Sequence, residues 1–79
     1  MALRLYTRAG CPLCEDMAEQ VRARLGGEPL AEIDVDGEPE LKVRYGWDVP
    51  LLFDGEREIC RHEFDAIAFA RWHDGRGGE

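Results

Sequence analysis

The spacing of apolar residues predicts how the chain begins. Residues 3–7 (Leu-Arg-Leu-Tyr-Thr) place apolar side chains at alternate positions and are mostly strand formers, which predicts a β-strand. Apolar residues then recur every four positions from Met17 to Leu25, the spacing of one helical face, and the glycine pair 26–27 ends that stripe. Pro12 suits the first turn of this helix, because its φ is already helical and its missing N–H would have no partner there.

Two further elements follow with the same two spacings. Residues 30–35 alternate apolar and polar side chains and predict a second strand with one half-buried face. A short helix is predicted from about 38 to 45, with Asp36 as its cap and Gly46 at its end. The side chains expected to face inward from this helix are Leu41 and Tyr45.

The C-terminal third predicts a hairpin and a last helix. Strands at 51–53 and 57–60 are joined by Asp54-Gly55, a dipeptide typical of two-residue hairpin turns. The last helix is expected over about 63–73. Its apolar face is expected to carry Phe64, Ile67, Ala68 and Trp72. Residues 75–79 contain nothing to bury and predict a flexible C-terminal tail.

These elements occur in the order β-α-β-α-β-β-α, which predicts an α/β fold. A strand, a helix and a second strand form a βαβ unit, whose strands pair in parallel through a right-handed crossover. The hairpin adds antiparallel pairing, so we expect a four-stranded mixed sheet with three helices. The 79 residues are enough for one domain, which is expected to occupy residues 1–74, followed by the tail at 75–79.

Composition excludes several classes of function. The net charge of −7 is spread along the chain, and no Lys/Arg cluster offers the basic face that nucleic-acid binding requires. No apolar run has the length of a signal peptide or a membrane span, and three cysteines do not make the disulfide framework of a secreted module. We therefore expect a cytoplasmic protein with no nucleic-acid or membrane partner.

The pair Cys11 and Cys14 carries the clearest chemical signal in the chain. Cysteines three residues apart lie on one side of a helix, at about the ~5–6 Å Cα separation that a disulfide requires. Cys11 would sit at the helix N-terminus, where unpaired N–H groups and the helix dipole stabilise a thiolate, and Arg8 adds a positive charge nearby. Cys14, one turn further in, is expected to stay a thiol until it resolves a mixed disulfide.

Two other interpretations of this motif remain open. A Cys-x-x-Cys pair can form half of a zinc site, or it can be two ordinary buried thiols. A zinc site could combine Cys11 and Cys14 with Cys60 and His62, although this spacing matches no closed zinc module. The strand–Cys-x-x-Cys–helix context is much more specific than the motif alone, and it favours a thioredoxin-like redox function.

Five other residues are given structural roles or stay undecided. Cys60 is expected to be a small apolar residue at the end of a strand. His62 and His73 are expected to be exposed, since a dithiol at a helix N-terminus needs no histidine to ionise. Trp47 and Tyr6 could line a groove beside the dithiol, and core packing explains them equally well.

With residues 6–14 (Tyr-Thr-Arg-Ala-Gly-Cys-Pro-Leu-Cys) and Val49-Pro50 both present, the chain resembles the glutaredoxins of the thioredoxin-like superfamily. The resemblance covers nearly the whole domain. It implies the thioredoxin-like fold, with Cys11 as the nucleophile and Cys14 as the resolving thiol. Dithiol glutaredoxins carry Cys-Pro-Tyr-Cys, and this chain has Leu13 in place of the tyrosine.

The resemblance also implies a substrate-binding surface around the dithiol. Arg8 matches the basic residue ahead of the motif that helps to bind the glycine carboxylate of glutathione. Val49-Pro50 matches the family's Thr-Val-Pro, with Asp48 in place of threonine. This match implies a cis peptide bond, which directs the Val49 backbone toward a peptide-like substrate for antiparallel pairing. The expected substrate-binding residues are Arg8, Pro12, Leu13, Val49 and Pro50.

The sequence departs from the glutaredoxins after the hairpin. The family continues with Gly-Gly and acidic residues that hold the γ-glutamyl end of glutathione, whereas residues 59–65 read Ile-Cys-Arg-His-Glu-Phe-Asp. Asp65 could supply an acidic contact, but the close backbone approach that glycine permits is missing. The chain therefore resembles short bacterial glutaredoxin-like proteins with an incomplete glutathione site. Through residues 45–47 (Tyr-Gly-Trp) it also resembles the glutaredoxin-like electron donors that thioredoxin reductase reduces.

The function expected from the sequence is dithiol–disulfide exchange, in which Cys11 attacks a substrate disulfide and Cys14 resolves the intermediate. No metal or organic cofactor is required for this chemistry. The expected partners are a disulfide-containing protein or a low-molecular-weight thiol, and a thiol reductant system, with the chain acting as a monomer. The alternative is a non-enzymatic thioredoxin-fold module that binds partners or carries a metal through Cys11, Cys14 and Cys60.

Overall fold

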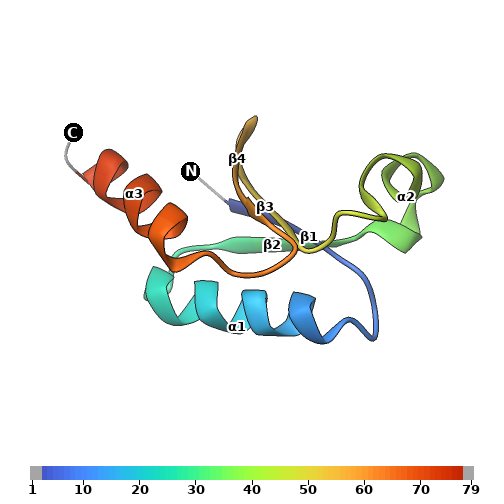
Figure 1. Cartoon of the computed structure of the whole chain (residues 1–79), viewed down its shortest axis with the longest axis horizontal. Helices are drawn as coiled ribbons and strands as arrows, with labels where there is room; N and C mark the ends of the chain where they lie inside the picture. Colours follow the sequence, from blue (N-terminus) through green and yellow to red (C-terminus); the bar gives the residue numbers. More distant parts are fainter. Residues whose placement is uncertain (1–2, 78–79) are drawn as a thin grey trace.

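The computed structural model describes residues 3–77 and forms a four-stranded sheet flanked by helices (Figure 1). The strands are β1 (Leu3–Thr7), β2 (Leu30–Asp34), β3 (Leu51–Asp54) and β4 (Arg57–Arg61). The helical elements are α1 (Pro12–Leu25), the 3₁₀ turn η1 (Val35–Gly37), α2 (Pro39–Tyr45) and α3 (Ala66–Gly77). The predicted order β-α-β-α-β-β-α is therefore confirmed.

The sheet has the strand order β2-β1-β3-β4. The pair β1–β2 is parallel, and the pairs β1–β3 and β3–β4 are antiparallel, so the predicted mixed sheet is confirmed. In this register Tyr6 lies opposite Leu51, and Leu51 lies opposite Arg61. The end of β1, the start of β3 and the end of β4 therefore meet at one end of the sheet. Cys11 follows the end of β1, so we call this end of the sheet the dithiol edge.

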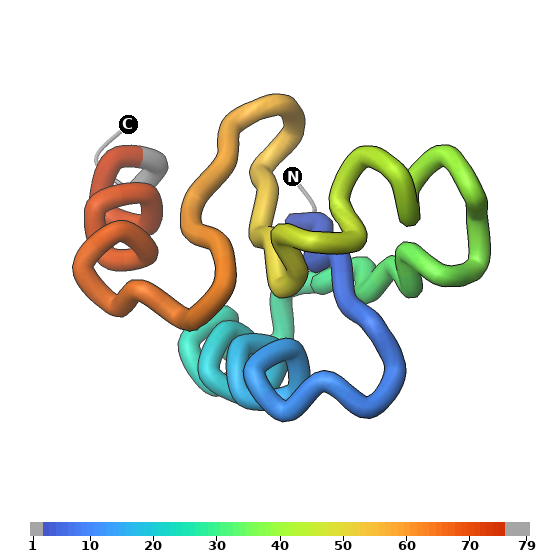
Figure 2. Tube along the Cα trace, turned by 45° about the vertical axis from the view of Figure 1, so that its right-hand side comes forward, coloured from blue at the N-terminus to red at the C-terminus, as the bar shows by residue number. Residues whose placement is uncertain are grey.

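The helices cover the two faces of the sheet separately. Figures 1 and 2 show α1 and α2 on opposite sides of the strands. The first core joins the sheet to α1 and α3 and contains Leu3, Leu5, Met17, Ala18, Val21, Leu25, Leu52, Ile59, Cys60, Phe69 and Trp72. The second core lies under α2 and contains Tyr6, Val35 and Leu51, with Ile33, Leu41, Tyr45, Val49 and Phe53 packed against it. Within residues 3–77, no helix combines the length and the apolar character that a bilayer span requires.

Alternation along the strands sends neighbouring side chains to different cores, as a pleated strand requires. Leu51 lies in the second core and Leu52 in the first. The strand β4 departs from this rule because its pairing skips one residue, Ile59, between Cys60 and Glu58. This bulge lets Ile59 and Cys60 both contribute to the first core.

The start of α2 differs from the sequence prediction. Asp36 does not cap this helix, because it lies in η1 and its carboxylate binds Arg8. The helix instead begins after Glu38, which forms no side-chain cap. The inward side is as predicted, since Leu41 and Tyr45 both pack against the second core.

The hairpin turn is Gly55-Glu56 and not the predicted Asp54-Gly55. Asp54 still pairs with Arg57 across the hairpin, so it belongs to β3. Its Oδ2 also accepts a hydrogen bond from Trp72 Nε1 at 2.8 Å, which ties the end of the strand to α3. Gly55 has a φ of 62°, and glycine suits this first turn position because it carries no Cβ.

The last helix begins and ends later than the sequence pattern predicts. It starts at Ala66 and continues to Gly77, whereas the prediction was 63–73. Asp65 caps it, because its Oδ1 accepts a hydrogen bond from the Ala68 N–H at 3.0 Å. The last two residues of the predicted tail, 78–79, lie outside the described residues.

The buried face of α3 also differs from the prediction. Ile67 was expected to face inward and is 68% exposed, whereas Phe69 is buried beside Trp72. Phe64 packs against the first core but precedes the helix, so it does not define a helical face. The inward side is instead set by two large aromatic side chains three residues apart, whose ring centroids are separated by 5.2 Å.

Candidate functional site

Cys11 lies where the loop after β1 enters α1. It is the N-cap residue, with a φ of −101° and a ψ of 104°, and its Sγ accepts a hydrogen bond from the Cys14 N–H at 3.2 Å. Its carbonyl accepts the first helical hydrogen bond, from the Glu15 N–H, at 3.1 Å. Backbone N–H groups at a helix start bind anions, and a hydrogen bond to a charged acceptor is stronger than one to a neutral acceptor. The backbone is thus arranged to receive a sulfur anion at Cys11.

Cys14 lies one turn further along and is only 2% exposed. Burial, together with the hydrogen bond to Cys11, raises the pKa of Cys14 to about 12. A backbone hydrogen bond from Arg8 and the positive charge of that residue act in the opposite direction and do not outweigh burial. None of the three cysteines forms a disulfide. Cys11 is half-buried and reachable from solvent, and Cys14 is an enclosed, protonated thiol.

The two residues between the cysteines are exposed. Pro12 occupies the first helical position, as the sequence predicted, and Leu13 is 52% exposed. An apolar side chain with this exposure next to the nucleophile leaves an uncharged surface on the helix side of Cys11. Both residues can therefore contact a substrate that approaches the dithiol.

Arg8 is held by an acidic residue that sequence reasoning assigned to another role. Its Nε lies 3.0 Å from Asp36 Oδ2, and its Nη2 lies 3.1 Å from Asp36 Oδ1, which makes a two-point ion pair. The contact follows from parallel pairing, because Thr7 and Asp34 are register partners and the residues after them leave the same edge. The parallel βαβ unit predicted from the sequence could therefore have indicated that Arg8 and Asp36 lie close together. Arg8 remains beside the dithiol, but its guanidinium already binds a carboxylate.

The Val49-Pro50 peptide bond is cis, as the resemblance implied. Pro50 is fully buried, and its carbonyl accepts a hydrogen bond from the His62 N–H at 2.8 Å. The Val49 side chain packs against the second core, but its backbone N–H and C=O form no hydrogen bond with residues 3–77. Because the start of β3 pairs with the end of β1, both residues lie at the same edge as Cys11. The Val49 backbone is free to pair with an extended peptide.

Asp48, which stands in place of the family's threonine, joins a small network of charged side chains. Its Oδ1 lies 3.5 Å from Arg61 Nη1 and 3.3 Å from His62 Nε2. Arg61 also donates from Nε to Glu58 Oε2 at 2.8 Å, and this pairing lowers the pKa of Glu58. His62 has a φ of 71°, a backbone conformation that favours glycine. In the segment where glutaredoxins have Gly-Gly, His62 therefore adopts a left-handed conformation and Arg61 adds a charged side chain.

Cys60 lies in the first core, and burial raises the pKa of its thiol, as expected for a small apolar residue. Among residues 3–77, no cluster of three or more Cys, His, Asp or Glu side chains could hold a metal ion. The four ligands considered for zinc are therefore not brought together.

The structure separates the two aromatic residues that the sequence left undecided. Tyr6 belongs to the second core, where its ring stacks on Tyr45 with centroids 4.5 Å apart. Trp47 is 92% exposed and lies beside Arg8, in a hollow of about 460 Å³ that also contains Asp36, Lys42 and Gly46. Tyr6 is therefore a core residue, and Trp47 is a surface residue close to the dithiol loop.

The family model of the glutaredoxin-like domain (DUF836) matches residues 2–72 of the chain. The chain belongs to this glutaredoxin-like family. The uncharacterized protein Rv0508 of Mycobacterium tuberculosis is 37% identical to this chain over 71 residues, which cover 80% of this chain and 72% of that protein.

Two solved structures resemble this glutaredoxin-like domain closely. The crystal structure of XcR50 from X. campestris is 32% identical, with a TM-score of 0.74, and the match covers 92% of this chain and 96% of that one. The solution structure of Ne2328 from Nitrosomonas europaea is 31% identical, with a TM-score of 0.76, and the match covers 90% of this chain and 88% of that one. A thioredoxin from Thermosipho africanus, 19% identical with a TM-score of 0.60, shares the fold alone, over 98% of this chain and 99% of that one. The predicted thioredoxin-like fold and its glutaredoxin-like variant are both confirmed.

Proposed function

We propose that this glutaredoxin-like domain is a dithiol–disulfide oxidoreductase. The Cys11 thiolate attacks one sulfur of a substrate disulfide, which forms a mixed disulfide and releases the first substrate thiolate. Cys14 then loses its proton and attacks Cys11 Sγ, which closes the internal disulfide and releases the second substrate thiolate. Two electrons pass from the dithiol to the substrate, so the substrate disulfide is reduced and the dithiol is oxidised.

The unequal surroundings of the two sulfur atoms carry this proposal. Cys11 is half-buried and receives the Cys14 N–H, whereas burial raises the pKa of Cys14 to about 12. A sulfur that solvent can reach at a helix start is suited to attack, and an enclosed thiol is protected from premature reaction. If both cysteines were inert core residues, we would expect both sulfur atoms to be enclosed, and only that of Cys14 is.

We assign substrate binding to the residues around the dithiol. The free Val49 backbone would pair with an extended substrate, and the buried cis Pro50 fixes the direction of that backbone. Pro12 and Leu13 would contact the substrate from the helix side. Arg8 would attract a carboxylate, within the limit set by its pairing with Asp36.

We further propose the setting in which this exchange takes place. The substrate would be a disulfide-containing protein or a low-molecular-weight thiol compound, and a cellular thiol system would reduce the internal disulfide. The reaction would occur in the cytoplasm, with the protein as a monomer. The chemistry needs no metal and no organic cofactor, because two thiols supply both electrons.

Trapping the mixed disulfide tests the proposal. The Cys14→Ser variant should accumulate a covalent adduct with insulin or cystine, because the resolving sulfur is gone, and mass spectrometry should locate it at Cys11. The Cys11→Ser variant should form no adduct, and Cys60→Ser should react like the wild type. Adducts at Cys14 or Cys60 would refute the assignment. Wild-type protein that reduces no disulfide but binds zinc would favour the non-enzymatic module instead.

A coupled assay identifies the reductant. Oxidised protein is supplied either with glutathione, glutathione reductase and NADPH, or with thioredoxin reductase and NADPH. The incomplete γ-glutamyl region predicts slow reduction by the glutathione system. Rapid turnover with glutathione alone would contradict that expectation.

A further inference from the structure

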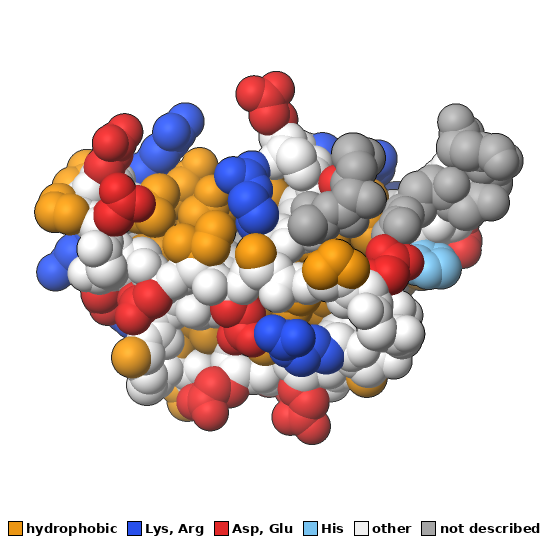
Figure 3. Space-filling model, turned by 180° about the vertical axis from the view of Figure 1, so that it is seen from behind, with side chains coloured by type: hydrophobic (Ala, Val, Ile, Leu, Met, Phe, Trp, Pro, Cys, Tyr) orange, Lys and Arg blue, Asp and Glu red, His pale blue; other side chains and the backbone are white. Residues whose placement is uncertain are grey.

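The C-terminal part of α2 and the turn after it expose apolar and basic side chains together. Trp47 is 92% exposed and Val43 is 84% exposed, the largest values among the large apolar residues of the described chain. Lys42 and Arg44 lie in the same helix, in its last turn. We call these four residues the α2 patch. Figure 3 shows hydrophobic and basic side chains side by side at this end of the molecule, on the left of that view, with acidic ones beside them.

The cations of the α2 patch lack carboxylate partners within the part of the chain that the structure describes. Lys42 forms no ion pair or hydrogen bond through its side chain with residues 3–77, and the guanidinium of Arg44 only covers the Tyr45 ring, 5.5 Å from its centroid. Glu40, in the first turn of the same helix, pairs with neither of them. Unpaired cations beside exposed apolar side chains, on a chain of net charge −7, form a surface complementary to an acidic partner.

The α2 patch adjoins the dithiol through Arg8. Its side chain lines the hollow of about 460 Å³ that contains Lys42 and Trp47. Arg8 also lines a second hollow, of about 370 Å³, together with Cys14. Gly46 forms part of the first hollow, where a Cβ would lie 3.1 Å from the Arg8 guanidinium and would also collide with a helix carbonyl. The surface therefore continues from the dithiol loop to α2.

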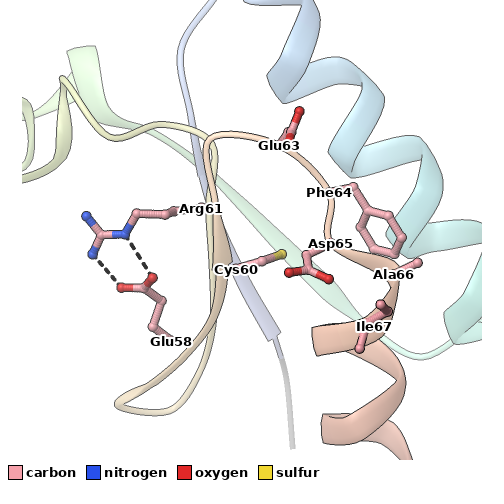
Figure 4. Close-up of a pocket in the computed structure, with 8 residues that line it drawn as sticks. All are labelled: Glu58, Cys60, Arg61, Glu63, Phe64, Asp65, Ala66 and Ile67. Atoms are coloured by element: carbon pink, nitrogen blue, oxygen red, sulfur yellow. Dashed lines mark hydrogen bonds and ion pairs between the residues drawn. The ribbon is translucent and has the colours of Figure 1, made fainter.

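The opposite side of the dithiol edge is acidic. A hollow of about 590 Å³ lies between β4 and the start of α3, and Figure 4 shows its lining residues. Arg61 is its only lining cation and is already bonded to Glu58, whereas Glu63 and Asp65 add two further carboxylates. An acidic segment of a substrate is repelled on this side and attracted on the α2 side.

We propose that the substrates of this site are proteins or peptides with acidic residues on the C-terminal side of their reactive cysteine, and that the α2 patch binds those residues. The direction follows from antiparallel pairing with Val49. Residues 46–48 precede Val49 and lead back to α2, so an antiparallel peptide extends its C-terminal part along them. This inference rests on the proposed exchange function and names its substrate class.

Two peptides of identical composition test the direction. Each contains one cysteine, held as a mixed disulfide with thionitrobenzoate, and four glutamates placed either after or before that cysteine. Reduced protein is mixed with each peptide, and release of thionitrobenzoate gives a second-order rate constant. Each constant is divided by the value for dithiothreitol, which corrects for the intrinsic reactivity of the peptide. We expect the peptide with glutamates after its cysteine to react roughly three- to tenfold faster at low salt, and this preference to fade in concentrated salt.

Charge reversal on α2 tests whether the α2 patch binds the glutamates of the peptide. The double variant Lys42→Glu/Arg44→Glu should lose or invert the preference, and Lys42→Ala alone should reduce it. The control Arg57→Glu/Arg71→Glu makes the same change in net charge at exposed positions outside the α2 patch, and it should keep the preference. Equal rates for the two peptides, or loss of preference in the control as well, would overturn the inference. If neither peptide reacts faster with wild type than with Cys11→Ser, the exchange function itself fails.

Discussion

At the dithiol, one helical turn separates a sulfur that solvent reaches from a sulfur that the core encloses. The enclosed thiol of Cys14 keeps its proton in the folded reduced protein, since burial raises its pKa to about 12. In the unfolded chain the same thiol is solvated and ionises near 9.0, its ordinary value. Folding and proton binding are therefore coupled at this residue.

The coupling predicts how the stability of the reduced protein depends on pH. Below about pH 9, Cys14 is protonated in both states, so its contribution to the free energy of unfolding is fully present. Between about pH 9 and pH 12 only the folded state keeps the proton, so this contribution falls as the pH rises. Urea unfolding of wild type and Cys14→Ala, both with excess dithiothreitol, should show a stability difference that shrinks over this range. A difference that stays constant would contradict the enclosed thiol.

The pairing of Arg8 with Asp36 predicts weak binding of glutathione. The γ-glutamyl end finds no Gly-Gly segment, and the glycine carboxylate meets an arginine that is already bonded. Each missing charged contact costs about 1.5–3 kcal/mol, so we expect a dissociation constant of about 1 mM or weaker. Asp36→Asn should strengthen binding by about two- to fivefold, because it releases the guanidinium. Chemical-shift titration with reduced glutathione measures both proteins. Low-micromolar binding with shifts concentrated at residues 61–65 would show an intact site.

At the scale of elements, the apolar spacing predicted which elements form and in what order, and long-range contacts decided where they end. Asp36 and Asp54 show why. Both are short polar residues that local rules place at a helix cap or in a turn, but one binds Arg8 and the other binds Trp72. Their partners are distant in sequence, so no local pattern could reveal them.

The candidate site divides in the same way. The positions of the two cysteines follow from a local strand–turn–helix pattern, and the cis bond before Pro50 follows from family resemblance. The network around Asp48 was not predicted, because it depends on the register between β3 and β4 and on the unusual backbone of His62. The positions of the reactive cysteines can be predicted from the sequence, but the charged side chains around them can be identified only from the folded structure.

The corrected face of α3 predicts unequal effects of two substitutions in one helix. Phe69→Ala should lower the free energy of unfolding by about 3–5 kcal/mol, because a buried ring leaves a cavity in the first core. Ile67→Ala should change it by no more than about 0.5 kcal/mol, because that side chain is mostly in solvent. Denaturant unfolding of both variants gives the comparison. Equal decreases in the free energy of unfolding would support the inward face predicted from the sequence, which included Ile67.

For the molecule as a whole, the two edge strands of the sheet, β2 and β4, bear on its association state. Free strand edges can pair with another chain, and charged side chains along an edge oppose this. On the edge strand β2, Glu32 is exposed and bound by Arg22, and on β4 Glu58 is exposed and bound by Arg61. The net charge of −7 adds repulsion between copies.

These charged edges predict a monomer. Sedimentation equilibrium of the reduced protein at physiological salt should give the mass of a single chain over a wide range of protein concentrations. A mass that rises toward twice this value with concentration would contradict the prediction. Repeating the run with excess dithiothreitol and with Cys60→Ser separates non-covalent pairing from accidental intermolecular disulfides.

The opposite exposures of the two tryptophans make the protein its own optical reporter. Trp47 stands in solvent next to the dithiol loop, whereas Trp72 is buried and its indole N–H is bonded to Asp54. Indole emission moves to shorter wavelengths when water is removed from the ring. In a Trp72→Phe protein, a peptide that covers Trp47 should therefore shift the emission toward the blue while the fold stays intact. In a Trp47→Phe protein the emission should respond to unfolding alone. One spectrometer could then follow docking and stability separately, without attaching any dye to a protein whose cysteines must stay free.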